Sequence, residues 1–236
     1  MFHPNDRPME RGWVGRIDGE RVIHLAAQTL QSFFLGGGGA REHAEYRLDE
    51  VTLLVPVLHP PAVRIFNAPR EFAFANPSSV LGPAATIVPP EDADPIGLLT
   101  RLAAVIGAEG AIGGFSVYAE WTAPGLPAPK DSGFGSQLGP CVVTPDEMAP
   151  ESLDVIIRQH GTEVTRCSLE GFDWADAVAY AAAGTELRPG DVIAGPSAHD
   201  ALNVEGYDIE IGDMEIGGIE IDVTGIGVLS ATVARR

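Results

Sequence analysis

Two stretches of sequence decide the fold of this chain: LLTRLAAVIG at residues 98–107 and GGFSVYAEW at residues 113–121. The first is an apolar run with β-branched members, which is typical of a buried strand. The second alternates between small or polar and larger apolar residues, which is the period of a strand. We therefore expect two strands joined by a short connection near the centre of a mostly β protein.

The composition agrees with a turn-rich β protein. The 236 residues include 28 glycines and 19 prolines, a high share that still lies below that of a low-complexity chain. This length allows one large or two small domains with a sizeable core. An apolar strand is predicted at residues 51–57, and prolines at positions 56, 60 and 61 lie at its end and just after it. We therefore predict a small N-terminal β domain over residues 1–60 and a second domain over residues 61–236.

Three further elements can be predicted from local patterns. The pattern of residues 13–25 predicts a β-hairpin with its turn at Asp18 and Gly19. Residues 155–165 predict a second hairpin with its turn at His160 and Gly161. The clearest helix covers residues 173–183. Asp173 can cap its first turn, apolar residues follow at helical spacing, and a glycine ends it.

Charge and cysteine content restrict the partners and the compartment. The chain has 15 Lys and Arg against 33 Asp and Glu, a formal net charge of −18. Nucleic acids and anionic membranes need a basic surface, so neither is an expected partner. Cys141 and Cys167 alone cannot make a disulfide framework, and the polar, proline-broken start resembles no signal peptide. We expect a cytoplasmic protein without a membrane span.

Common cofactor and metal motifs are missing from the sequence. GFGSQLG at residues 133–139 looks at first like a dinucleotide loop, but Pro140 and a strand follow it, so no helix N-terminus is available for a pyrophosphate. The six histidines show no metal-binding spacing. We expect no cofactor.

Five segments, taken in chain order, resemble the fumarylacetoacetate hydrolase family. The resemblance covers about three-quarters of the chain, from Arg64 to the C-terminus, and implies a rolled, β-rich barrel with few helices that usually forms homodimers. The matching segments are FANPSS at 74–79 with Gly82 and Pro83, LAAVIG at 102–107, Lys130 with LGP at 138–140 and VVT at 142–144, LRPGDVI at 187–193, and GIGVL at 225–229.

The resemblance also implies a metal site, and this sequence departs from it. Family enzymes hold Mg or Mn with an E-x-E pair before the LAVVIG-like strand and an Asp on the next strand. Leu99, Arg101 and Glu120 stand at these positions. A divalent ion beside Arg101 would meet close like-charge repulsion that one carboxylate cannot offset. We expect no metal.

The family's water-activating lid has no counterpart in this sequence, because residues 63–66 run almost directly into residues 72–74. Asn76 stands at a family lysine, Ser197 stands at a family threonine, and Lys130 is retained. The resemblance therefore assigns catalytic roles to Arg101, Glu120 and Lys130. Substrate-binding roles are expected for the side chains Asn76, Ser78, Gln137 and Ser197.

These residues favour a metal-independent enzyme that acts on a small keto-acid, 1,3-dicarbonyl or polyketide-like substrate. Arg101 would bind a carboxylate or enolate, Glu120 would pair with it or act as base, and Lys130 would polarise a carbonyl. Tautomerisation, dehydration or cyclisation fits better than hydrolysis. Two alternatives stay open: a non-catalytic binding or scaffolding relative, and ordinary family hydrolase, isomerase or decarboxylase chemistry at an unusual metal site.

Overall fold

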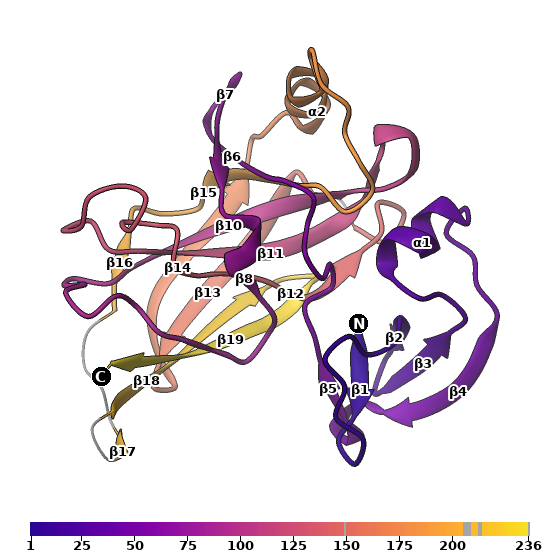
Figure 1. The fold of residues 1–236 in the computed structure, drawn as a ribbon, viewed down its shortest axis with the longest axis horizontal. Coiled ribbons are helices and arrows are strands. Elements are labelled where there is room, and N and C mark those ends of the chain that lie inside the picture. Colours follow the sequence, from indigo (N-terminus) through magenta and orange to yellow (C-terminus); the bar gives the residue numbers. More distant parts are fainter. Residues whose placement is uncertain (149, 205–208, 212–213, 236) are drawn as a thin grey trace.

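The computed structural model describes residues 1–148, 150–204, 209–211 and 214–235. Within these residues the chain is mostly β-strand, with two short α-helices. Figure 1 shows the strands of the later chain in one large body, with the first strands beside it and one helix above it. The predicted mostly β fold is confirmed.

The largest sheet has eight strands and contains both stretches that we expected at the centre. Its order is β7-β6-β15-β10-β11-β12-β8, and β16 also pairs with β10. The bounds are β6 Val63–Ala68, β7 Glu71–Ala75, β8 Val80–Leu81, β10 Gly97–Ile106, β11 Ile112–Thr122, β12 Ser136–Val143, β15 Val192–Ser197 and β16 Leu202–Asn203.

A second sheet of six strands packs against one face of the first. Its order is β14-β13-β18-β19-β9, and β17 also pairs with β18. Apolar side chains of β10 and β11, such as Leu102 and Val117, share one core cluster with Val155 and Ile221 from this sheet. The bounds are β9 Ala85–Ile87, β13 Ser152–Gln159, β14 Thr162–Glu170, β17 Ile209–Ile211, β18 Met214–Val223 and β19 Gly227–Arg235.

The first part of the chain builds two small sheets of its own, β1-β5 and β2-β3-β4, and a helix α1 that packs on the large sheet. Phe34 of α1 shares a core cluster with Val63 and Val105. Gly113 leaves room for its ring, because a Cβ there would lie 2.6 Å from Phe34. The domain boundary near residue 60 and the homodimer stay predictions. The bounds are β1 Phe2–Pro4, β2 Gly15–Asp18, β3 Arg21–Leu25, α1 Leu30–Leu35, β4 Glu42–Arg47 and β5 Val51–Leu53.

Most local predictions are confirmed, with two differences. Both predicted hairpins form, and α2 (Trp174–Ala182) begins after its Asp173 cap. The strand predicted over residues 51–57 ends at Leu53, three residues before Pro56. Helix α1 was not predicted, although Thr29 and Ser32 form a capping box at its start. No helix among the described residues is long and apolar enough to cross a membrane.

A buried ion pair joins strand β6 to the residue that precedes β15 in the large sheet. Arg64 on β6 donates from Nη1 to Oδ2 of Asp191 at 3.0 Å, and the two side chains are 5% and 3% exposed. The same oxygen accepts the backbone N–H of Arg188 at 3.2 Å. The Arg64 guanidinium also lies 5.4 Å from the centre of the Phe74 ring. Removing either charge would leave the other buried without its partner.

We predict that Asp191→Asn lowers the free energy of unfolding by about 3 to 5 kcal/mol, because it strands the buried Arg64 charge. Urea denaturation followed by circular dichroism measures this loss. Asp49→Asn is the matched control, since Asp49 pairs with Arg47 at an exposed position. The control should leave the unfolding midpoint nearly unchanged. Equal effects of the two variants would contradict the prediction.

Candidate functional site

Arg101 is a buried cation at the centre of the large sheet, and four hydrogen bonds hold it. Its Nε donates to Glu120 Oε2 at 2.9 Å, and its Nη2 donates to Asn67 Oδ1 at 2.9 Å. Its Nη1 donates to the carbonyl oxygens of Gly195 at 3.0 Å and Phe66 at 3.3 Å. Arg101 and Glu120 are 4% and 13% exposed. The structure therefore brings together the two charged residues that the sequence singled out.

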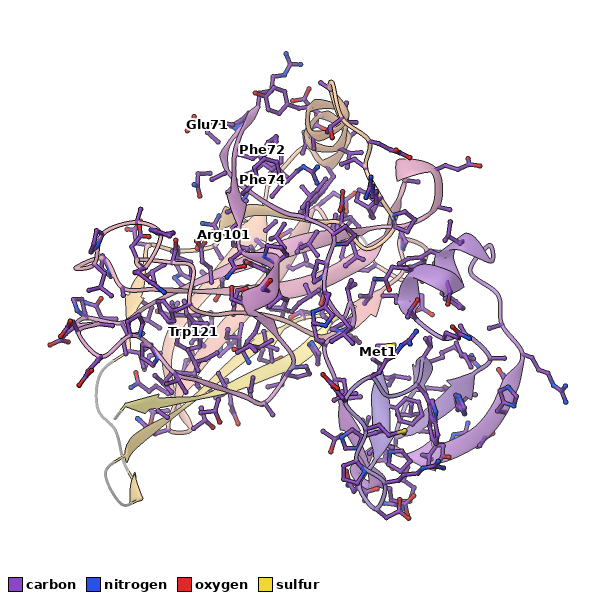
Figure 2. The ribbon with its side chains drawn as sticks, in the orientation of Figure 1. Met1, Glu71, Phe72, Phe74, Arg101 and Trp121 are labelled. Atoms are coloured by element: carbon purple, nitrogen blue, oxygen red, sulfur yellow. The ribbon has the colours of Figure 1, made fainter. Side chains whose placement is uncertain are left out.

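Strand register explains why these side chains meet. Arg101 lies directly opposite Tyr118, and Leu99 lies directly opposite Glu120, in the antiparallel pair β10 and β11. Side chains two apart on a strand share a face, so Tyr118 and Glu120 lie on the same face as Arg101. Figure 2 shows Arg101 in the interior, beneath the hairpin that carries Phe72 and Phe74.

A cavity of about 150 Å³ opens beside this pair, and Glu120 is the carboxylate in its wall. The apolar part of the wall includes Ile65, Ala73 and Ala75 from strands β6 and β7. Hydroxyl and amide groups make up the remaining polar part. These polar residues are Asn67, Asn76, Ser79, Tyr118, Ser132 and Ser136.

Tyr118 supplies a neutral hydroxyl to the cavity. Burial raises the pKa of its phenol well above the ordinary range, and the nearby Glu120 carboxylate raises it further, while contact with Ser136 acts in the opposite direction. A raised pKa in an acid means that the neutral form is favoured. Tyr118 therefore keeps its proton at neutral pH, as a hydrogen-bond donor requires.

The predicted cations do not form part of the cavity wall. Arg101 lies behind Glu120 and is not a lining residue. Lys130 is exposed in the loop between β11 and β12, and the wall is formed by its neighbours Pro129 and Ser132. The expected contact of Lys130 with a substrate carbonyl stays a prediction.

The predicted substrate-binding residues differ in whether they line this cavity. Asn76 lines the cavity, and its Nδ2 donates to the Gly133 carbonyl at 3.1 Å. Ser78 is not a lining residue, whereas the adjacent Ser79 is. Ser79 is the last residue of the 3₁₀ turn at residues 77–79, and this turn places it in the cavity wall.

Gln137 makes hydrogen bonds within the protein, and the binding role that we expected for it stays a prediction. Its Nε2 donates to the carbonyls of Gly82 at 3.1 Å and Ser230 at 3.0 Å, and its Oε1 accepts from Trp121 Nε1 at 3.2 Å. Successive side chains of β12 point to opposite faces of the sheet. Ser136, which pairs with Glu120, therefore lies on the cavity face instead. A shift of one residue exchanges the faces of a strand.

Ser197 is also outside this cavity. Its hydroxyl donates to the backbone carbonyl of His199 at 2.7 Å. It lines a smaller cavity of about 60 Å³ together with Phe172 and Trp174. The substrate contact expected for Ser197 stays a prediction.

Five polar cavity residues were missed from the sequence: Asn67, Ser79, Tyr118, Ser132 and Ser136. Tyr118 could have been found, because it stands two residues before Glu120 on the same strand. Ser136 required the register between β11 and β12, and Asn67 required the contact between β6 and Arg101.

Residues 42–234 match the family described as Fumarylacetoacetate (FAA) hydrolase C-terminal. The chain belongs to the fumarylacetoacetate hydrolase family. Among curated proteins, no sequence matches this one.

Solved structures of family-like fold lie close to this one. The 5-carboxymethyl-2-hydroxymuconate delta-isomerase from Mycobacterium smegmatis is 22% identical with a TM-score of 0.76, over 100% of this chain and 98% of that chain. The maleylpyruvate hydrolase from Sphingobium sp. SYK-6 is 19% identical with a TM-score of 0.78, over 96% and 98%. At such identities the likeness concerns the fold.

A metal fits poorly at the position that the family resemblance assigns to it. A further structure of the Sphingobium hydrolase contains manganese(II) and pyruvate. In the present chain the Leu99 side chain offers no oxygen ligand, and the Arg101 guanidinium is bonded to Oε2 of Glu120, so it would place a cation beside the ion. The described residues contain no group of three or more His, Cys, Asp or Glu side chains that could hold an ion. These residues do not fit a divalent cation.

Strands β6 and β7 form a tight hairpin at the position where the family resemblance implies a lid. Strands β6 and β7 pair from Val63 with Ala75 to Ala68 with Glu71, and only two residues join them. No lid helix can be accommodated in this connection, as the sequence predicted. The cavity is therefore covered by β7 and the 123–135 loop rather than by a separate closing segment.

We predict that Arg101→Met destabilises the fold by about 3 to 5 kcal/mol at pH 7, because Glu120 then lacks its cation. Adding Glu120→Gln to Arg101→Met should recover most of the loss. Denaturant titration at pH 7 measures these differences, with the exposed Arg16→Met as control. No effect of Arg101→Met would contradict the pair's structural role.

We also predict that added Mg²⁺ or Mn²⁺ leaves the melting temperature of the protein unchanged. An ion that binds only the folded state must raise that temperature by mass action. Differential scanning calorimetry after treatment with a chelator provides the baseline. A calorimetric titration that finds one micromolar site per chain would contradict the assignment of Arg101 to this position.

Proposed function

We propose that this protein is a metal-independent enzyme that acts on a small carbonyl compound of the keto-acid, 1,3-dicarbonyl or polyketide-like class. The reaction is a tautomerisation, dehydration or cyclisation that begins with loss of a proton beside a carbonyl. The observation that carries the proposal is a single carboxylate, Glu120, in the wall of a small polar cavity and bonded to a buried arginine.

Glu120 is the general base in this proposal. Its carboxylate removes a proton from the carbon next to the substrate carbonyl, and the C–H electron pair moves into the enolate. For a tautomerisation, the protonated Glu120 then returns the proton at a different carbon of the enolate. Positioned general bases of this kind accelerate reactions by about 10² to 10⁴.

The neighbouring hydroxyls supply the second requirement, which is stabilisation of the enolate oxygen. Tyr118 and Ser136 both line the cavity, and the raised pKa of Tyr118 keeps its proton available for donation. Fixed donors aimed at a developing negative charge act strongly in a site shielded from water. Arg101 serves as a positioning residue, because its Nε holds Oε2 of Glu120 and leaves Oε1 available to the substrate.

Two observations favour these reactions over hydrolysis. The hairpin between β6 and β7 leaves no segment for the family's water-activating pair. Among the described residues that line the cavity, none is a histidine. Proton transfer by a single carboxylate needs neither group.

A binding protein without catalysis is the second candidate function. It is favoured by the four internal acceptors that hold Arg101 and by the absence of both Arg101 and Lys130 from the described cavity wall. Such a protein would bind the same small molecules but would leave their α-protons in place.

Proton exchange separates the two functions. We predict that the protein accelerates deuterium exchange of the α-protons in one or more of butan-2-one, acetoacetate and 2-oxobutanoate, followed by NMR in D₂O. Glu120→Gln should lower this rate by about 10² to 10⁴, whereas the exposed Glu20→Gln should not. Exchange at the uncatalysed rate with every compound, or an unchanged rate in Glu120→Gln, would refute the enzymatic proposal.

A further inference from the structure

We infer that the cavity beside Glu120 selects an uncharged dicarbonyl or hydroxy-carbonyl ligand and discriminates against the corresponding carboxylate. This inference rests on the proposed function and narrows its substrate class. It follows from the charges, the hydrogen bonds and the size of this one site.

The first argument concerns the charge that a ligand meets. Glu120 lines the cavity, and among the described lining residues there is no lysine, arginine or histidine. The ion pair of Arg101 and Glu120 is neutral as a whole, but its carboxylate end faces the ligand and its guanidinium end does not. A ligand carboxylate would therefore approach a like charge without an opposing one, in surroundings that screen charge poorly.

The second argument concerns the number of hydrogen bonds that Arg101 can still donate to a ligand. A guanidinium has five N–H groups. Four of them are donated to Glu120, Asn67, Gly195 and Phe66, and the side chain is only 4% exposed. Arg101 is thus satisfied by the protein itself. A carboxylate could engage it in a bidentate manner only by breaking one or more of these bonds, which argues against the anion-binding role that the sequence suggested.

The third argument concerns what the wall does offer. Asn67 Oδ1 accepts from Arg101, so the NH₂ group of this lining amide is left as a donor. Tyr118, Ser132 and Ser136 add hydroxyl groups. Neutral donors of this kind match carbonyl and hydroxyl oxygens. The apolar side chains of Ile65 and Ala75 complete a wall suited to a short carbon chain.

The size of the cavity sets the scale of the ligand. Its volume of about 150 Å³ is comparable to that of an engineered protein cavity that holds benzene. A short dicarbonyl compound fills such a space. A larger ligand would have to extend through the opening toward the exposed Phe74.

Acetoacetamide and acetoacetate provide a matched pair for the test, since they share shape and differ in charge. Binding of each to the full-length protein is measured by protein-observed NMR titration at pH 7. We expect acetoacetamide to bind at least about tenfold more tightly, which corresponds to about 1.4 kcal/mol. Equal binding, tighter binding of acetoacetate, or binding of neither compound would overturn the inference.

Two variants locate the source of the preference. Glu120→Gln removes the negative charge and leaves Arg101 uncompensated, so it should abolish or reverse the preference for acetoacetamide. Glu20→Gln makes the same change of charge at an exposed position and should leave the ratio of the two affinities unchanged. A preference that persists in Glu120→Gln, or that changes in Glu20→Gln, would show that Glu120 does not set the selectivity.

The charge preference and the enzymatic proposal can fail separately. If acetoacetate binds better and its α-protons exchange in a Glu120-dependent manner, the inference is overturned and the enzyme remains. If acetoacetamide binds better but no compound exchanges its protons faster than in buffer, the selectivity of the site is supported and the enzymatic proposal is refuted.

Discussion

The structure depends on one buried guanidinium. A charge at the depth of Arg101 needs acceptors on every side, because an unpaired ion in the interior is strongly destabilising. The acceptors come from three other strands: Glu120 on β11, Phe66 and Asn67 on β6, and Gly195 on β15. One side chain therefore ties together the central strands of the large sheet. It does so at the position where the family resemblance predicts a metal ion.

The same arrangement fixes the chemistry of the cavity. Arg101 donates to one oxygen of Glu120 and to the side-chain oxygen of Asn67. The other carboxylate oxygen of Glu120 and the NH₂ group of Asn67 are therefore left for the cavity wall, whereas Arg101 itself does not line it. A divalent ion would instead leave coordination positions open for a substrate carboxylate. In our proposal, an arginine that donates four hydrogen bonds within the protein stands where the ion would lie, and the cavity suits proton transfer from neutral molecules.

The shortened connection between β6 and β7 is consistent with this change. A hairpin joins the two strands where the family has a lid, and its Phe72 packs against Phe66 with a ring-centre distance of 5.3 Å. Arg64, bonded to Asp191 beneath these rings, anchors the hairpin to the interior. The strand is therefore held by packing and an ion pair instead of moving over the cavity as a separate segment.

The sequence by itself determined the strands and the central pair. The apolar run at residues 98–107 and the period of two along residues 113–121 identified β10 and β11, and the family segments placed Arg101 and Glu120 at corresponding positions. Only the tertiary structure decided which groups line the cavity. The wall includes Asn67, Tyr118 and Ser136, which the sequence did not indicate, and it does not include Lys130, Gln137 or Ser197. Strand periodicity is a local property of the chain, whereas a cavity wall is made by residues far apart in sequence, whose facing depends on register, bulges and loop conformation.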